Sequence, residues 1–161
     1  MDEHSKVDFR LTDVKIRNAK LIDFTKGLRE CFSSLGQVGT DIEVETAFRS
    51  RCTERTHTFV ACKGDKVVGT ITVIICPKFT HGGKSAGQIE DVATHPEYRG
   101  RGVGSALVEH AIEFCRLRSC YKVILNCKPE LVEFYTMFRF QENEIEMRLD
   151  MSKVDGVPRK R

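Results

Sequence analysis

The sequence predicts an α/β fold in which a mixed β-sheet lies between helices. Two β-rich runs, 57–62 and 67–75, flank a short polar turn and predict a hairpin in the first half of the chain. A glycine-rich segment then separates a strand at 88–94 from an amphipathic helix at 106–117. Strands and helices alternate from there on, a pattern typical of a sheet covered by helices.

The elements before the hairpin follow from their periodicity. Residues 13–18 alternate apolar and polar side chains, as a strand does, and apolar residues in 22–35 recur near helical spacing. Two glycines interrupt this pattern, after which Thr40 or Asp41 can cap a second helix that reaches about Cys52. One side of that helix holds the apolar residues Val44, Phe48 and Cys52.

The elements after the hairpin turn are also readable. The run that ends at Pro77 is almost continuously apolar and predicts a central strand, and a glycine-rich connection fills 78–87. The segment 121–127 predicts a buried strand. The last predicted elements are a short helix over 131–138, with Pro129 at a plausible first helical position, and a strand or hairpin over 140–150.

Length and composition indicate one intracellular globular domain. The 161 residues suit a single domain, with a core of about 12–150 and flexible tails at 1–10 and 152–161. No apolar run is long enough to cross a bilayer, and the polar N-terminus lacks a secretory signal, so we expect a cytoplasmic protein. A formal charge of +3 is too small to indicate nucleic acid and suits a small anionic ligand equally well.

The seven cysteines predict packing residues rather than a metal site or a disulfide framework. Their number is odd and no pair has the C-x-x-C spacing of a zinc site, so we expect no metal. Without a signal to an oxidising compartment, reduced thiols packed as small hydrophobic residues are the plain interpretation.

The strongest local motif is Arg99-Gly100-Arg101-Gly102-Val103-Gly104-Ser105, which follows a strand and opens a helix. Glycines allow a tight turn, and free N–H groups at a helix N-terminus favour an anion. A nucleotide-hydrolysing loop needs a lysine after its last glycine, and a dinucleotide loop needs G-x-G-x-x-G early in the chain, so both fit poorly. The alternative interpretation is that this motif binds no phosphate and is only a glycine-rich helix start with surface arginines.

The pattern R-x-x-G-x-G after a strand resembles the pyrophosphate loop of the GNAT superfamily of N-acetyltransferases. Its neighbours narrow the resemblance to one branch, the glucosamine 6-phosphate N-acetyltransferases. The segments that resemble this branch are Lys78-Phe79-Thr80-His81, Gln88-Ile89-Glu90-Asp91-Val92, Cys120-Tyr121-Lys122 and Val132-Glu133-Phe134-Tyr135. Together the resemblance covers about residues 16–150.

This resemblance implies a mixed sheet splayed between two strands, with acetyl-CoA in the split and an amino sugar phosphate as acetyl acceptor. It also implies a homodimer in which the end of one chain helps to build the partner's site. The implied cofactor contacts are Val92, Ala93, Thr94, Arg99, Gly100, Arg101, Gly102, Val103, Gly104, Ser105, Asn126 and Tyr135. The implied acceptor contacts are Lys78, Phe79, Thr80, His81, Glu90, Asp91, Val92, Tyr121, Lys122 and Arg148.

The reaction needs a neutral amine held against the acetyl carbonyl, and a leaving sulfur that receives a proton or hydrogen bond. A backbone N–H within 92–94 would polarise the carbonyl, and Tyr135 would supply the proton or hydrogen bond to the leaving sulfur. Glu90 and Asp91 would contact the amine. From spacing alone Tyr135 is a core aromatic residue and the two acids are a solvated strand end; the resemblance favours the catalytic interpretation.

Four positions depart from the family pattern, and they concern mainly the acceptor. Asn126 replaces the usual acid, and an amide cannot take the amine proton. Asp150 stands where an arginine often reaches the partner's sugar phosphate, with Arg148 as a possible substitute on the same strand face. Gly36 replaces a hydroxyl residue and Ser105 a frequent lysine.

Cys127, next to Asn126, would lie near the bound thiol, and we predict that it forms a mixed disulfide with coenzyme A under oxidation. Two other functions stay open from the sequence: an acetyltransferase for another amine, such as a protein N-terminus, a lysine or a polyamine, and a non-catalytic acetyl-CoA-binding module.

Overall fold

The computed structural model describes residues 11–51 and 53–151. They fall into two compact units, of which the first ends at Leu125 and the second begins at Asn126. The predicted tails and Cys52 lie outside the described residues, and the single-domain assignment stays a prediction.

The first unit is built on a five-stranded sheet in the order β1-β2-β3-β4-β5. Its first four strands pair antiparallel, and β5 pairs parallel to β4, so the sheet is mixed. The strands are β1 (Val14–Asn18), β2 (Thr56–Lys63), β3 (Lys66–Pro77), β4 (Ser85–Thr94) and β5 (Lys122–Leu125).

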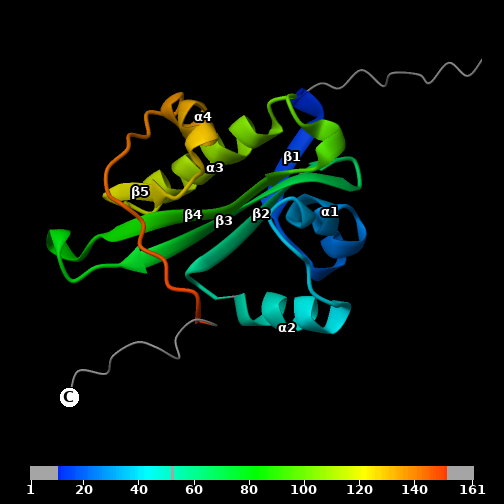
Figure 1. Ribbon diagram of the computed structural model, residues 1–161, viewed down its shortest axis with the longest axis horizontal. Coiled ribbons are helices and arrows are strands. Elements are labelled where there is room, and N and C mark those ends of the chain that lie inside the picture. The colour runs from blue at the N-terminus through cyan, green and yellow to red at the C-terminus, as the bar shows by residue number, and fades with distance from the viewer. Residues whose placement is uncertain (1–10, 52, 152–161) are drawn as a thin grey trace, which may run out of the picture. The chain divides into compact units, whose positions relative to one another are not determined.

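Helices cover both faces of this sheet (Figure 1). On one face α3 (Val103–Leu117) packs His110 and Phe114 against Phe59 of β2. On the other face lie α1 (Leu28–Ser33) and α2 (Asp41–Arg51). The core beneath α1 consists of Leu28, Cys31, Val60, Cys62, Val67 and Ala93. This mixed sheet between helices confirms the predicted fold class.

The strands and helices differ from the sequence prediction in places that have physical causes. Residues 22–35 are not one helix: a 3-10 turn (Leu21–Thr25) and α1 meet at Gly27, whose φ of +113° breaks the helix. A Cβ at Gly27 would lie 2.5 Å from the carbonyl oxygen of Val67, so the chain comes too close to the sheet there for a side chain.

The second predicted helix is confirmed as α2, and its cap is Thr40, one of the two residues predicted for this position. The Thr40 N–H donates to Glu43 Oε2 at 2.8 Å, and the Glu43 N–H donates to Thr40 Oγ1 at 3.4 Å, which is a capping box.

Two strands were predicted with wrong limits. β4 begins at Ser85, earlier than the predicted residue 88, and β5 is shorter than the predicted 121–127. The description of β5 as buried is wrong as well, because its residues alternate between exposed and half-buried. Only one face of β5 is covered, so its apolar run did not indicate burial on both faces.

The second unit contains a 3-10 turn (Pro129–Leu131), with Pro129 at its first position as predicted, and α4 (Val132–Thr136). The predicted strand over 140–150 is wrong for this structure, since no strand is assigned between 137 and 151. Apolar side chains recur at every second residue over 145–151, as in a strand, but a strand also needs a neighbouring strand to hydrogen-bond with. The side chains of Ile145, Met147, Leu149 and Met151 are 88%, 90%, 60% and 76% exposed.

Burial determines the character of the cysteines. It raises the pKa of the Cys31 and Cys115 thiols to about 12, as expected of inert packing residues.

Within 11–51 and 53–151, no helix is long and apolar enough to span a membrane, and no group of three or more metal-binding side chains is found.

Candidate active site

The sheet is only half closed between β4 and β5. Their pairing runs from Ala86 opposite Lys122 to Ile89 opposite Leu125. β4 continues to Thr94, so residues 90–94 extend beyond the last pair with β5. The backbone groups of this stretch that face β5 are available to a ligand lying along the strand, as the predicted splay requires.

A bulge in β4 gathers the two acidic residues on one face. Thr72 of β3 pairs with Glu90 and Thr70 pairs with Ala93, so Asp91 and Val92 together oppose the single residue Ile71. Asp91 has a φ of +53°, which redirects the chain within the bulge. In a regular strand, adjacent side chains point to opposite faces.

Contacts place both carboxylates on the face of the sheet that α1 and α2 cover. Thr72, the partner of Glu90, and Asp91 both contact Arg51 of α2. The Glu90 carboxylate also accepts a hydrogen bond from Gln88 at 2.8 Å. A regular β4 would have turned Asp91 towards α3 instead.

The predicted phosphate loop joins the end of β4 to α3. Gly100 and Gly102 have φ values of +70° and +81°, and a Cβ at Gly100 would meet nothing within 4 Å. No side chain caps the N-terminus of α3 at Gly102, so no side-chain oxygen satisfies the first helical N–H groups. Arg99 and Arg101 are exposed, and the guanidinium of Arg101 lies 5.7 Å from the ring centroid of Tyr98.

The position of this loop depends on how closely α3 approaches the sheet. Gly69 of β3 faces Val103 and Leu107, and Gly87 of β4 faces the thiol of Cys115. At both positions a Cβ would come closer than side chains tolerate. Residues 99–105 therefore fit a diphosphate: they combine a helix N-terminus without a side-chain cap and two exposed cationic side chains.

A cavity of about 510 Å³ lies between α1, α2 and the sheet. Most of its wall is apolar, from the side chains of Phe24, Leu28, Phe32, Leu35, Val44 and Phe48. Asp91 and Arg51 belong to its lining, as does Gly36, which the sequence had associated with the acceptor. Asp91 is thus next to a space large enough for a small molecule.

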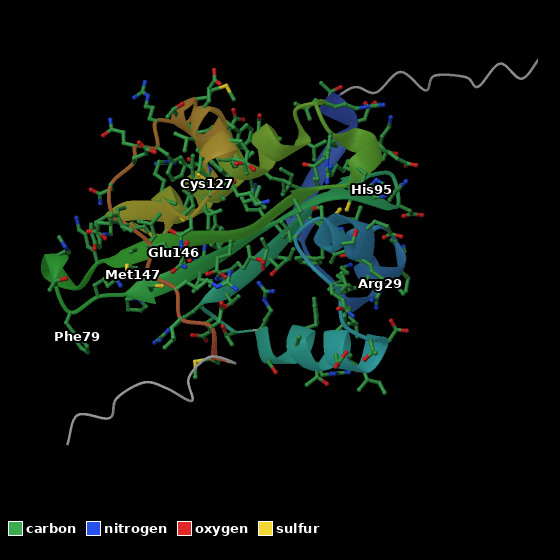
Figure 2. The ribbon with its side chains drawn as sticks, viewed as in Figure 1. Arg29, Phe79, His95, Cys127, Glu146 and Met147 are labelled. Carbon is green, nitrogen blue, oxygen red and sulfur yellow. The ribbon has the colours of Figure 1, made fainter. Side chains whose placement is uncertain are left out.

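Cationic and aromatic residues gather at the opposite end of β4. The ring of His81 stacks on Tyr121 with centroids 4.0 Å apart, and the Lys122 ammonium lies 5.6 Å from the centroid of the same ring. Phe79 projects fully exposed from the β3–β4 connection (Figure 2). Lys78 and Thr80 are exposed beside it.

The register fixes how far this cluster lies from the acids. Lys122 pairs with Ala86, four residues before Glu90, which corresponds to about 13 Å along the strand. Ala86, Gln88 and Glu90 alternate onto the face opposite α3, because the intervening Gly87 contacts Cys115 of α3. One face of the sheet therefore has the Lys122 ammonium near the start of β4 and the two carboxylates at its bulge.

The remaining predicted residues belong to the second unit. Tyr135 is buried, with Phe134 and Phe140 at ring centroid distances of 5.0 and 6.0 Å. Burial, and then the neighbouring Cys127, raise the pKa of Tyr135 above its ordinary value. Asn126 and Cys127 are exposed, and Arg148 is bound to Asp150 through an N–O distance of 2.7 Å.

Sequence reasoning missed Arg51 and the threonines beneath it. Arg51 follows Val44 and Phe48 by seven and three residues, so helical spacing puts it on the same side of α2. A charged residue on an apolar helix side was the available signal, but the predicted apolar side was completed with Cys52 instead.

A sheet that opens beside a glycine-rich helix start is the arrangement expected of the acetyltransferase class that the sequence resemblance implied. A family model described as "Acetyltransferase (GNAT) family" matches residues 21–140. The chain therefore belongs to the GNAT family.

Individual relatives narrow the comparison. Over 86 residues the chain is 44% identical to a glucosamine 6-phosphate N-acetyltransferase of Trypanosoma brucei brucei; the match covers 53% of this chain and 58% of the relative, less than two thirds of its length. Over 143 residues it is 33% identical to glucosamine 6-phosphate N-acetyltransferase 1 of Oryza sativa subsp. japonica, covering 84% and 86%.

A solved structure gives the same indication. The crystal structure of glucosamine-6-phosphate N-acetyltransferase from Arabidopsis thaliana matches with a TM-score of 0.79 and 30% identity. The match covers 86% of this chain and 98% of the Arabidopsis chain.

Proposed function

We propose that this protein transfers an acetyl group from acetyl-CoA to the 2-amino group of glucosamine 6-phosphate, giving N-acetylglucosamine 6-phosphate and coenzyme A for UDP-N-acetylglucosamine synthesis. The observation that carries the proposal is the charge order along β4. The acceptor has an ammonium group at one end and a phosphate at the other. The Glu90–Asp91 bulge suits the first, and the His81, Tyr121 and Lys122 cluster suits the second.

Acetyl-CoA supplies the activated acetyl group. The amides and cations of residues 99–105 hold its diphosphate, and the unpaired edge of Val92, Ala93 and Thr94 binds its extended arm as a neighbouring strand would. A backbone N–H of this edge polarises the thioester carbonyl. Both substrates are thereby held along β4, and positioning of this kind supplies a large share of rate.

The proton balance assigns roles to side chains. The bound ammonium first releases one proton and becomes the neutral amine. The amine gives up a second proton as its bond to the acetyl carbon forms, and the carbon–sulfur bond breaks with the electron pair on sulfur. Because the sulfur takes up one proton, one proton is released to solvent overall. Tyr135 is protonated at neutral pH like any tyrosine, and burial raises its pKa further, so it has a proton to donate to that sulfur. Glu90 and Asp91 bind the amine, whose proton passes to a carboxylate or to water, because Asn126 cannot accept it.

The active enzyme is proposed to be a homodimer with shared sites in the cytoplasm. The exposed apolar alternation Ile145, Met147, Leu149 and Met151 supports this assembly, because it has the pattern of a strand that covers one apolar face on a neighbour. A second copy of the chain supplies such a neighbour, and Arg148 on the alternate face then approaches the partner's sugar phosphate.

A thiol-release assay with acetyl-CoA tests the proposal. Glucosamine 6-phosphate should be acetylated in strong preference to glucosamine, to peptides and to polyamines. Equal rates with and without the phosphate would point to another acceptor, and coenzyme binding without turnover of any amine would point to a binding module.

A charge variant makes this assay sharper. Lys122→Met should lower kcat/KM for glucosamine 6-phosphate by roughly 10- to 100-fold, because one charge-assisted hydrogen bond is lost. The kcat/KM for glucosamine, which has no phosphate, should not change. Lys15→Met is the matched control, because Lys15 is also an exposed strand lysine but lies on β1, at the other edge of the sheet. Equal effects of the two variants would contradict the phosphate role of Lys122.

A further inference from the structure

Arg51 is the cationic side chain nearest to the proposed amine site, and nothing in the proposed reaction has yet used it. It stands at the last position of α2 and reaches across to two strands. Its Nη2 donates to Asp91 Oδ2 at 2.7 Å and to Thr72 Oγ1 at 3.0 Å. The Thr72 hydroxyl in turn lies 3.1 Å from the Thr58 hydroxyl on β2.

These contacts hold the guanidinium at a defined place. Thr72 is fully buried, and Thr58 and Thr72 are register partners on β2 and β3. A single nitrogen with two protons is therefore divided between a fixed hydroxyl and the Asp91 carboxylate. The side chains of Arg51 and Asp91 are 40% and 30% exposed, so the pair borders the cavity without being sealed from it.

Asp91 needs such support more than a regular strand residue does. Its φ of +53° lies in the left-handed region, which costs a side-chain-bearing residue about 1 kcal/mol. A bulge by itself leaves the direction of its side chain less determined than a paired ladder does. Among the described residues, Arg51 gives the only hydrogen bond that the structure shows to this carboxylate.

We infer that Arg51 is a positioning residue for acetyl transfer: it fixes the Asp91 carboxylate through Oδ2 so that Oδ1 is presented to the acceptor amine. This inference rests on the proposed function. Arg51 acts through Asp91 and touches neither substrate. Its contribution belongs to the acceptor side of the reaction, since the phosphate loop at 99–105 begins beyond the end of β4.

Kinetics on four proteins test this assignment: wild type, Arg51→Met, Asp91→Asn and the double variant. Arg51→Met should lower kcat/KM for the acceptor about tenfold, with the KM for acetyl-CoA unchanged. In the Asp91→Asn background the same change should cost less than about twofold, because the group through which Arg51 acts is already altered. Arg51→Lys, which keeps the charge, should recover part of the loss.

Arg49→Met is the matched control. Arg49 is on the same helix, carries the same charge and forms a surface ion pair with Glu45 at 2.6 Å, and its loss should leave both kinetic constants unchanged. Equal losses from Arg51→Met in the wild-type and Asp91→Asn backgrounds would overturn the inference, as would a loss confined to acetyl-CoA.

A crystal structure of Arg51→Met separates this inference from the proposed function. We expect the Asp91 carboxylate to leave the position it occupies beside Thr72. An unmoved carboxylate would overturn the inference whatever the kinetics show. If the wild-type protein acetylates no amino sugar phosphate, the proposed function fails, and the displaced carboxylate still supports Arg51 as the residue that positions Asp91.

Discussion

Replacing Gly69 by alanine should disturb cofactor binding from a position that touches no cofactor. A Cβ at Gly69 would lie 2.8 Å from Val103 Cγ1 and 2.9 Å from Leu107 Cδ1, both at the start of α3. Val103 belongs to the phosphate loop, so relief of this overlap has to move the loop, β3 or both. Gly69 does not have a positive φ, and the perturbation is therefore steric alone.

The magnitude follows from the packing. Overpacking a well-filled core by one methyl group costs typically 1–3 kcal/mol. For 161 residues with an unfolding entropy of about 2.1 cal/mol/K each, a loss of about 2 kcal/mol lowers the Tm by about 6 °C. A shift of a few tenths of an ångström at the loop amides should also weaken coenzyme A binding, by about tenfold if one charge-assisted contact is lost.

Differential scanning fluorimetry and calorimetric titration with coenzyme A measure the two effects. Gly64→Ala is the control, because Gly64 lies in the β2–β3 turn, where an added Cβ meets nothing within 4 Å, and its loss costs only the left-handed φ of +56°. Both variants should lose stability, and only Gly69→Ala should lose affinity for coenzyme A. A destabilised Gly69→Ala protein with wild-type affinity would refute the coupling of α3 packing to the loop.

Four further outcomes are expected. Burial lowers the pKa of His57 and His110, so the unfolded chain binds more protons and the Tm should fall as pH drops below about 6.5; His110→Phe should flatten this fall, and an unchanged slope would count against it. Met147→Glu should shift the protein from dimer to monomer in light scattering and reduce turnover, whereas a dimer with full activity would exclude this stripe as the interface. Tyr135→Phe should lower kcat about a hundredfold at nearly constant KM for acetyl-CoA, and undiminished turnover would remove its proton-donor role. With glutathione disulfide as oxidant, Cys127 should form a mixed disulfide with coenzyme A that intact mass detects and Cys127→Ser abolishes; no adduct at Cys127 would disprove it.

Local features of the molecule were predictable from the sequence. The glycine-rich loop before α3 is encoded by residues next to one another, and Gly100 and Gly102 adopt the positive φ values that their type suggested. The β2–β3 hairpin follows from two β-rich runs around one turn, and the start of α2 from its Thr40 cap. These features depend on neighbours within a few positions, which pattern rules describe well.

Features that depend on distant contacts were missed or misjudged. The Arg51–Asp91 pair joins residues 40 positions apart, and it exists only because α2 lies over the bulge in β4. The break at Gly27 comes from the approach of the carbonyl of Val67, which no local pattern reveals. The strand or hairpin predicted over 140–150 is absent, because whether such a segment becomes a strand depends on a partner outside it.

The β4 bulge explains how two adjacent acidic residues come to lie on one face of the sheet. In a regular strand a one-residue shift exchanges the two faces, so Glu90 and Asp91 could not both serve the same amine. The bulge inserts its extra residue opposite Ile71, which is fully buried, and pairing is resumed on both sides of it, with Glu90 opposite Thr72 and Ala93 opposite Thr70. Beyond the bulge, Ala93 returns to the core and Thr94 pairs with Gly69 beneath α3. The same insertion thus turns Asp91 towards α2, where Glu90 already points, and sets the register of Ala93 and Thr94 at the end of β4. Deleting Val92 should therefore remove amine acetylation and coenzyme A binding together, although neither the loop at 99–105 nor Lys122 is altered.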